Sequence, residues 1–348
     1  MAEDRIALIG LDGEELTAIM AEMGQSPFRA KQIKRWLLKG AEFSEMTNIP
    51  STLRDALSER YTPLALFREY EMHEDETDTT KFLFRTADDI IIESVGLIYD
   101  GRLTVCVSTQ AGCAMGCSFC SSTVGGLLRN LTSAEMISQL VLAGRIMGKE
   151  IANIVLMGSG EPLNNYDSVK EFLVYIMRGD TLNIGIRHIT LSTCGIVPGI
   201  DRMIEDGLFV NLSLSLHCAV NDVRVQLMPV EKKYHLQDAF SACMRFRKAS
   251  GRRITLEYCV VEGLNDTEQC ARALKNLMKG TDSEVNLIDY NKKDGYRKLN
   301  SRSAADRFAA MLKKYGIDYT LRRRLGSSIN AACGQLKSTY IKDRQEFK

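Results

Sequence analysis

From about residue 101 onward, the sequence alternates between strand-like and helix-like segments, and this alternation constrains the fold more than any other feature. Short runs rich in Val, Ile and Leu are followed by segments of helical periodicity; the runs are LTVCV, ANIVLM, RHITLS, FVNLSLSL, ITLEYCVV, EVNLID and DYTLRR. Such alternation is typical of parallel strands joined by crossover helices. We therefore predict an α/β protein whose core, residues 101–325, is a complete or partial (β/α) barrel. Its active site should lie at the carboxyl ends of the strands.

The segments before this core have different patterns. Residues 1–75 are predicted to form a small N-terminal helical domain, in which the string FRAKQIKRWLLKG has an apolar face made of Phe28, Ile33, Trp36 and Leu37. Residues 76–100 contain two β-like runs separated by a turn at 87–89, which predicts a connecting β-hairpin. A C-terminal segment, residues 326–348, follows the core.

The composition is that of an ordinary globular protein, with 348 residues, 45% hydrophobic and 26% charged. The N-terminal string MAEDRIALIG is acidic where a signal peptide would be basic, and no apolar run reaches about 18 residues. We expect a cytoplasmic protein without a membrane span. Ten cysteines in a reducing compartment are better interpreted as metal ligands, catalytic thiols or packing residues than as disulfides.

The net charge of +1 is nearly neutral, but the basic residues gather in three clusters. They are Arg29, Lys31, Lys34, Arg35 and Lys39; Lys292, Lys293, Arg297, Lys298 and Arg302; and Arg322, Arg323 and Arg324. Each cluster is compatible with contacts to nucleic-acid phosphates and equally with a solvated surface. The first cluster makes the N-terminal domain a candidate nucleic-acid-binding module, with a purely structural appendage as the alternative.

Three cysteines stand close together in the string QAGCAMGCSFCSS, directly after the predicted strand LTVCV. Cys113, Cys117 and Cys120 have the spacing C-x3-C-x2-C. Three thiolates on one short loop can bind three irons of a 4Fe-4S cluster and leave the fourth iron without a protein ligand. A structural zinc site is the alternative, but it needs four ligands, and no second cysteine pair or histidine partner occurs nearby in the sequence. The pattern favours the iron–sulfur cluster.

A glycine-rich string, MGSGEPLNN, includes the end of the next predicted strand. Together with the cysteine motif it resembles the radical S-adenosylmethionine (SAM) superfamily, in which SAM occupies the open iron. The resemblance implies a barrel of the radical SAM type. It also implies that Gly158 and Gly160 let the backbone approach the SAM amino group, and that Glu161 accepts a hydrogen bond from this group.

Further strings, among them VCVSTQAGC, FSEMTNIP, LSTCGIVP, SLSLH and AACGQL, resemble the RlmN/Cfr family of RNA adenosine methyltransferases over nearly the whole chain. This resemblance implies methylation of carbon 2 of adenosine in 23S rRNA, at an adenosine 2503 type of site, with adenosine 37 of tRNA as a further substrate. The alternative within the family is Cfr-type methylation of carbon 8. The strings GEPL and FSEMTNIP look more like RlmN, although both reactions use the same cysteines.

The resemblance assigns catalytic roles to Cys333, Cys106 and Glu93. Cys333 would take a methyl group from one SAM, and a radical formed from a second SAM would activate this group for addition to the base. Two SAM are thus used per turnover. Glu93 would accept the proton of the ring carbon, and Cys106 would then attack the sulfur of Cys333, which closes a transient disulfide and releases the RNA. Without the resemblance, Glu93 would be interpreted as a solvent-facing residue at a strand edge.

The same resemblance implies SAM contacts at the ends of successive strands, from Gly160, Glu161, Ser192, Ser215, Leu216, His217 and Asn291. Taken singly, these residues are equally typical of turns, of helix caps and of hydrogen bonds to the backbone. Cys194, Cys218, Cys243, Cys259 and Cys270 are interpreted as packing residues.

Two departures from the family pattern lie near the expected substrate. Ser159 stands where the family often has Met, and Lys292 and Lys293 stand where it commonly has Pro after Asn291. The expected partners are 23S rRNA and tRNA, an electron donor such as flavodoxin, and a thiol reductant. A non-catalytic RNA-binding protein with a structural metal site is the alternative from another functional class.

Overall fold

The computed structural model describes residues 5–290 and 303–322. Its centre is a ten-stranded sheet with the order β14-β13-β12-β11-β10-β9-β6-β5-β4-β3. Asn291, Cys333 and most of the second and third basic clusters lie outside the described residues. No helix in the described part of the chain is both long enough and apolar enough to cross a membrane.

Seven strands of the sheet are parallel, and they are the seven that the sequence predicts. They are β6 (Arg102–Cys106), β9 (Ile151–Leu156), β10 (Ile189–Thr193), β11 (Asn211–Ser215), β12 (Thr255–Val260), β13 (Glu284–Asp289) and β14 (Tyr319–Leu321). Within the described residues, β14 and β3 are the two ends of the sheet and do not pair with each other. The barrel is therefore open, and the prediction of a partial barrel is confirmed.

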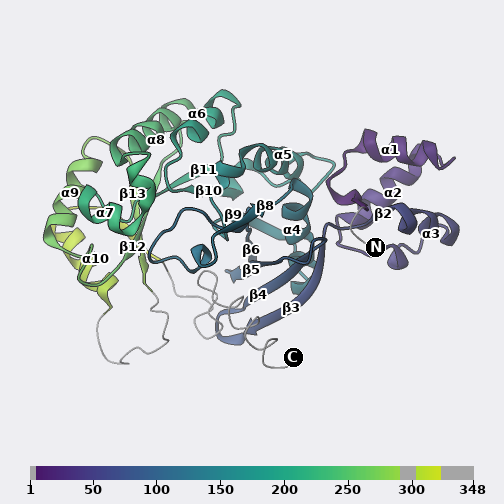
Figure 1. The fold of residues 1–348 in the computed structure, drawn as a ribbon, viewed down its shortest axis with the longest axis horizontal. Coiled ribbons are helices and arrows are strands. Elements are labelled where there is room, and N and C mark those ends of the chain that lie inside the picture. Colours follow the sequence, from purple (N-terminus) through teal and green to yellow (C-terminus); the bar gives the residue numbers. More distant parts are fainter. Residues whose placement is uncertain (1–4, 291–302, 323–348) are drawn as a thin grey trace.

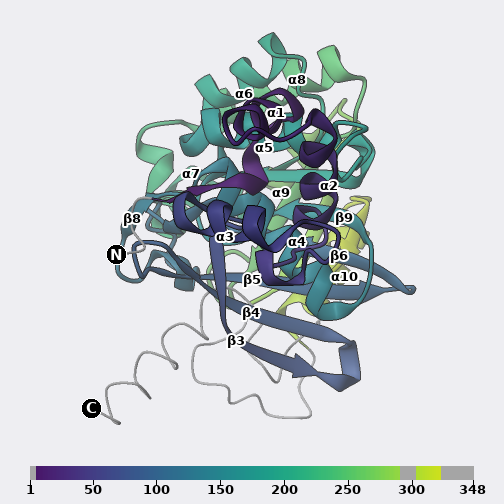
Figure 2. The same cartoon turned by 90° about the vertical axis from the view of Figure 1, so that its right-hand side faces the viewer.

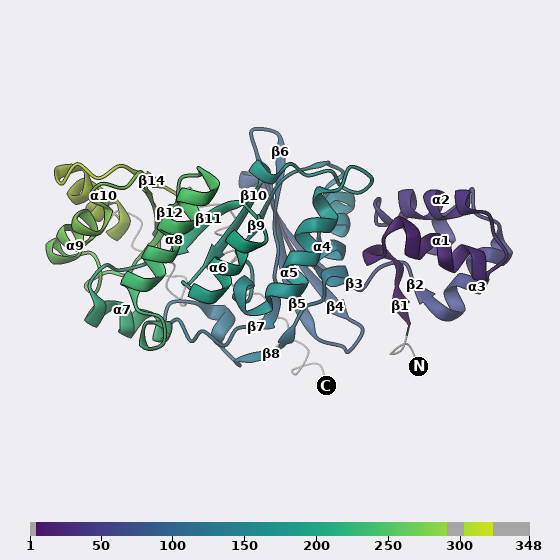
Figure 3. The same ribbon diagram turned by 90° about the horizontal axis from the view of Figure 1, so that it is seen from above.

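Helices cover one side of this parallel sheet, as Figure 3 shows. They are α4 (Ser133–Met147), α5 (Tyr166–Met177), α6 (Val197–Glu205), α7 (Asn221–Leu227), α8 (Leu236–Ser250), α9 (Glu268–Met278) and α10 (Ala304–Lys314). Most of them bury one apolar face; in α5, Val169, Phe172 and Ile176 recur at helical spacing and are buried. The opposite side of the sheet is left for the site.

Three antiparallel strands extend the same sheet beyond β6. They are β3 (Leu66–Glu74), β4 (Thr79–Thr86) and β5 (Ile91–Tyr99), with β5 paired to β6. The turn predicted at 87–89 separates β4 from β5. Residues 1–75 were predicted to be helical, and this prediction is wrong for Leu66–Glu74, which form a strand. The charged string LFREYEMHE offers little apolar alternation, and pairing with the buried strand β4 makes it a strand.

The N-terminal lobe lies to one side of the sheet (Figure 1). It contains β1 (Ile6–Ala7), α1 (Gly13–Glu22), α2 (Pro27–Leu37), α3 (Ser51–Arg60) and β2 (Tyr61–Thr62). On α2 the buried residues are Ala30, Ile33, Lys34 and Leu37, which share one helical face. Phe28 is two residues out of step with this face and is 61% exposed, so its predicted place on the apolar face of the helix is wrong.

A buried lysine joins this lobe to the barrel. The Nζ of Lys34 donates a hydrogen bond of 2.6 Å to Asp180, which lies just after α5. Lys34 is only 7% exposed, and its ammonium keeps the pKa of Asp180 below the usual value. Arg145 of α4 makes a second connection by donating to the carbonyl of Gly40 at 2.6 Å. Lys34 therefore helps to dock the lobe and is not available as an RNA contact, in contrast to the expectation for its cluster.

Replacing Asp180 by Ala should lower the free energy of unfolding by about 1–3 kcal/mol, because it leaves a buried ammonium without its acceptor. The matched control is Asp201→Ala, which removes the partner of the exposed Arg245 and should cost less than about 1 kcal/mol. Urea denaturation of the two variants makes the comparison. Equal costs would show that the Lys34 contact does not hold the lobe.

Candidate functional site

The three cysteines of the motif lie on one loop beside the barrel. After β6, a small hairpin of β7 (Gln110–Gly112) and β8 (Leu127–Asn130) carries this loop between its strands. Gly112 has a φ of +80°, and a Cβ built there would lie 2.0 Å from the carbonyl oxygen of Gly126. The loop can close in this way only with glycine at residue 112.

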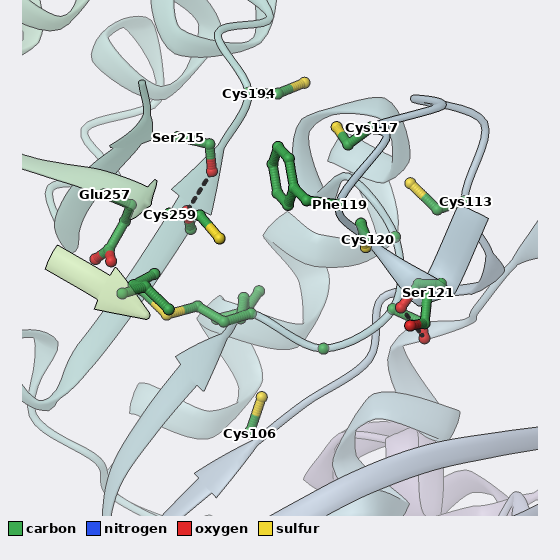
Figure 4. A pocket seen from close by; sticks show the side chains of 18 of the residues that line it. Cys106, Cys113, Cys117, Phe119, Cys120, Ser121, Cys194, Ser215, Glu257 and Cys259 are labelled. Carbon is green, nitrogen blue, oxygen red and sulfur yellow. Dashed lines mark hydrogen bonds between the residues drawn. The ribbon is translucent and has the colours of Figure 1, made fainter. Parts of the chain in front are cut away.

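Cys113, Cys117 and Cys120 line one cavity together (Figure 4). Within the described part of the chain, no three potential ligands converge closely enough for a single metal ion. A 4Fe-4S cluster does not require its ligands to converge on one point, because each thiolate binds a different iron. Three cysteines spaced around one cavity therefore suit such a cluster. Burial and the two neighbouring cysteines raise the pKa of Cys117 to about 12, so its thiolate needs a cationic partner. The donor set fits such a cluster.

The cavity has a volume of about 660 Å³ and opens at the carboxyl ends of the parallel strands. It brings together most of the predicted site, and its lining includes Glu93, Cys106, Gly160, Glu161, Ser192, Ser215 and His217 besides the three cysteines. Leu216 is fully buried and is not part of the lining. Its backbone N–H donates to the carbonyl oxygen of Glu257 at 3.0 Å, so the structure gives it a role in holding the strand end.

The glycine-rich loop after β9 packs against the segment that follows β6. A Cβ on Gly158 would lie 2.7 Å from Ser108, and one on Gly160 would lie 2.6 Å from the side chain of Gln110. The sequence interpretation explained these glycines by the approach of SAM. The structure adds a requirement from within the protein, since both positions touch the neighbouring backbone segment. The departure Ser159 also lies here, and its hydroxyl donates to that of Ser122 at 3.1 Å.

Glu161 is buried, and its carboxylate is already held by the protein. Its Oε2 accepts a hydrogen bond from the Cys194 backbone at 2.8 Å, and its Oε1 accepts one from Leu163 at 3.1 Å. Burial raises the pKa of this carboxyl in spite of these bonds. The carboxylate thus connects the glycine-rich loop to the loop after β10, and it presents a fixed acceptor to any group bound in the cavity.

His217 lies in the loop after β11 with a φ of +55°. Its Nδ1 accepts a hydrogen bond from the Cys259 backbone at 2.9 Å, so the ring proton belongs on Nε2. Burial lowers the pKa of His217 to about 3, which keeps the ring neutral. The ring packs against Phe119 of the cysteine loop, with centroids 4.5 Å apart. Nearby, the hydroxyls of Ser192 and Ser215 are 3.1 Å apart.

Sequence reasoning missed several residues of the lining, among them Lys81, Glu257 and Arg322. A signal was available for both Lys81 and Glu257, since Glu257 is the one charged residue of β12, and Lys81 directly precedes the apolar run FLF of β4. Cys194 and Cys259 were interpreted as packing residues; both are buried, but both also line the cavity.

Comparison with known proteins gives one consistent result. Residues 107–274 match the model of the radical SAM superfamily, and residues 6–62 match that of the "Ribosomal RNA large subunit methyltransferase N-terminal domain". The chain is 45% identical over 335 residues to a probable dual-specificity RNA methyltransferase RlmN of Clostridium botulinum, which covers 95% of this chain and 96% of that one. A relative of the same name from Alkaliphilus oremlandii is also 45% identical and covers 98% of this chain and 100% of its own length.

A solved structure agrees with these sequences. The crystal structure of a radical SAM methyltransferase from Sphaerobacter thermophilus superposes with a TM-score of 0.86 at 38% identity, over 95% of this chain and 98% of that one. The similarity therefore extends over both the N-terminal lobe and the barrel.

Replacing Gly160 by Ala should destabilise the protein by at least about 2 kcal/mol, because the new Cβ would meet Gln110 in a backbone conformation that strains an L residue. Gly251→Ala is the control. Its φ of +68° is also positive, but a Cβ there meets nothing within 4 Å, so only the backbone strain of about 1 kcal/mol is expected. Thermal unfolding of both variants tests this, and equal losses would refute the proposed packing role of Gly160.

Proposed function

The chain belongs to the RlmN family of radical SAM RNA methyltransferases, and from this premise we propose that it methylates carbon 2 of adenosine in 23S rRNA and in tRNA. The names of its relatives, "dual-specificity RNA methyltransferase", support two classes of RNA substrate. Membership in an enzyme family favours catalysis over the non-catalytic RNA-binding protein considered above.

The observation that carries this proposal is that one cavity holds the cluster cysteines and the separate residues needed to finish the reaction. Cys106 at the end of β6 and Glu93 on β5 line the same cavity as Cys113, Cys117 and Cys120. In Figure 4, Cys106 lies apart from the cysteine loop across the cavity. An adenine inserted between the cysteine loop and Cys106 would contact both the side of the cavity that would hold the cluster and the thiol that would release the product.

A 4Fe-4S cluster bound here together with SAM would supply the one-electron chemistry that generates a carbon-centred radical. The three cysteines of the loop would bind the cluster as thiolates. Gly160, Glu161, Ser192, Ser215 and His217 would hold SAM, with neutral His217 donating from Nε2. Phe119 beside His217 excludes water from this side of the site.

The remaining steps are assigned to Cys333, Glu93 and Cys106. Cys333 carries the methyl group, Glu93 takes the proton from the ring carbon, and Cys106 attacks the sulfur of Cys333. Burial raises the pKa of Cys106, and the nearby Arg322 opposes this rise. Cys106 is thus kept as a thiol until the base is in place, with a guanidinium near enough to stabilise the thiolate that attacks.

Analysis of the nucleoside product tests the reaction itself. Anaerobically reconstituted protein, supplied with SAM, a reductant and unmodified 23S rRNA or tRNA, should yield 2-methyladenosine by mass spectrometry. A product methylated at carbon 8 would instead establish the Cfr-type reaction and contradict the proposal.

Replacing Cys106 by Ala should trap the intermediate, because no thiol remains to release the RNA from Cys333. We expect a covalent protein–RNA adduct on a denaturing gel and a loss of product of at least about 100-fold. Cys243→Ala, which changes a fully buried cysteine of α8 away from the cavity, should turn over normally and form no adduct. Normal turnover by the Cys106 variant would refute its role.

A further inference from the structure

A lysine and a glutamate form a buried ion pair in the wall of the cavity. The Nζ of Lys81 lies 3.6 Å from the Oε2 of Glu93, with the two side chains 1% and 8% exposed. This distance is longer than a hydrogen bond, so the contact is mainly electrostatic. Both residues line the cavity that holds Cys106 and the cysteine loop.

The register of the sheet places this pair beside Cys106. Lys81 of β4 stands opposite Val95 of β5, and Val95 stands opposite Cys106 of β6. Residues opposite each other in antiparallel strands share a face of the sheet, and so do residues two apart on one strand. Lys81, Val95 and Cys106 therefore form a row across three strands, and Glu93 lies on the same face, two residues before Val95.

The position of Lys81 is costly if it serves packing alone. Phe82, Leu83 and Phe84 follow it on β4, and all are fully buried. An apolar side chain would be accommodated more easily among them, because removing an ammonium from water carries a large desolvation cost. A buried charge pair in the wall of a cavity is typical of a functional site.

We propose that Lys81 is a positioning residue for the proton transfer, whose ammonium pairs with Glu93 and directs its carboxylate toward the base. This inference rests on the proposed function, in which Glu93 accepts the ring proton. In that step the C–H bond of the ring carbon breaks, the proton moves to a Glu93 oxygen, and the electron pair stays in the ring. Lys81 keeps its own proton throughout.

The other charges of the site explain why such a cation is needed. Among the described residues of the lining, the carboxylates are Glu93, Glu161, Glu257 and Asp289, and the cations are Lys81 and Arg322. Burial raises the pKa values of Cys106 and Glu257, and Arg322 opposes the rise in both. The groups that face Glu93 from the packed elements are Lys81 from β4, and Cys106 and Ser108 from β6 and the residues after it. The Ser108 hydroxyl donates to the backbone carbonyl oxygen of Glu93, and the Nζ of Lys81 lies 3.6 Å from the Glu93 carboxylate.

The test compares Lys81→Met and Lys81→Arg with the native holoenzyme. Lys81→Met should lower the rate of RNA methylation at least about 10-fold, a fraction of the 10²–10⁴-fold that a general base supplies. Cleavage of SAM to deoxyadenosine should continue, and the covalent protein–RNA adduct should accumulate above its level in the native enzyme. Lys81→Arg should restore most of the rate and remove the excess adduct.

Two controls separate a positioning role from a loss of folding. Lys34→Met removes the other buried lysine described above, away from the cavity, and should leave the methylation rate and the adduct level unchanged. The double variant Lys81→Met with Glu93→Gln should be no slower than Glu93→Gln alone, because Lys81 acts through Glu93. An additive loss in the double variant, or an adduct level in Lys81→Met no higher than in the native enzyme, would overturn the inference. If the native enzyme makes no methyladenosine, the result contradicts the proposed function itself. This outcome can be told apart from those that contradict only the role of Lys81.

Discussion

The close packing of the glycine-rich loop against the segment after β6 is the constraint on which the rest of the site depends. The N–H of Gly158 donates to the Val107 carbonyl oxygen at 3.1 Å, and the N–H of Glu161 donates to the Gln110 side chain at 2.9 Å. The packing leaves no room for a Cβ at residue 158 or at residue 160. One end of the segment after β6 continues into the cysteine loop, so the same contacts fix the cysteine loop and the glycine-rich loop relative to each other.

Buried charge is the second theme of the site. Glu161 and Glu257 both have pKa values raised by burial, and each is held by neighbouring hydrogen-bond donors or cations rather than by bulk water. His217 is kept neutral in the same surroundings. The low dielectric of such a cavity strengthens the electrostatic interactions of every charge placed in it. This suits the proposed reaction, which moves an electron, a proton and a methyl group in sequence.

The sequence predicted the parallel core well, because a strand buried on both faces is recorded as a continuous apolar run. Most of the site followed from motifs and from the rule that loops at the carboxyl ends of such strands meet. The strand β3 was missed, since its charged residues carry no alternation and its conformation depends on pairing with β4. The burial of Lys34 and Lys81 was not predicted, for a related reason. A lysine in a sequence is expected at the surface, and only the packed structure shows that each has a carboxylate partner.

The account rests most on the claim that the loop of Cys113, Cys117 and Cys120 holds a 4Fe-4S cluster with one iron open to SAM. Iron analysis combined with electron paramagnetic resonance of the anaerobically reconstituted, reduced protein tests this directly. The account predicts about four irons per chain and a cluster signal that changes when SAM is added. A protein that holds zinc or no iron at this loop, or a cluster signal indifferent to SAM, would contradict it.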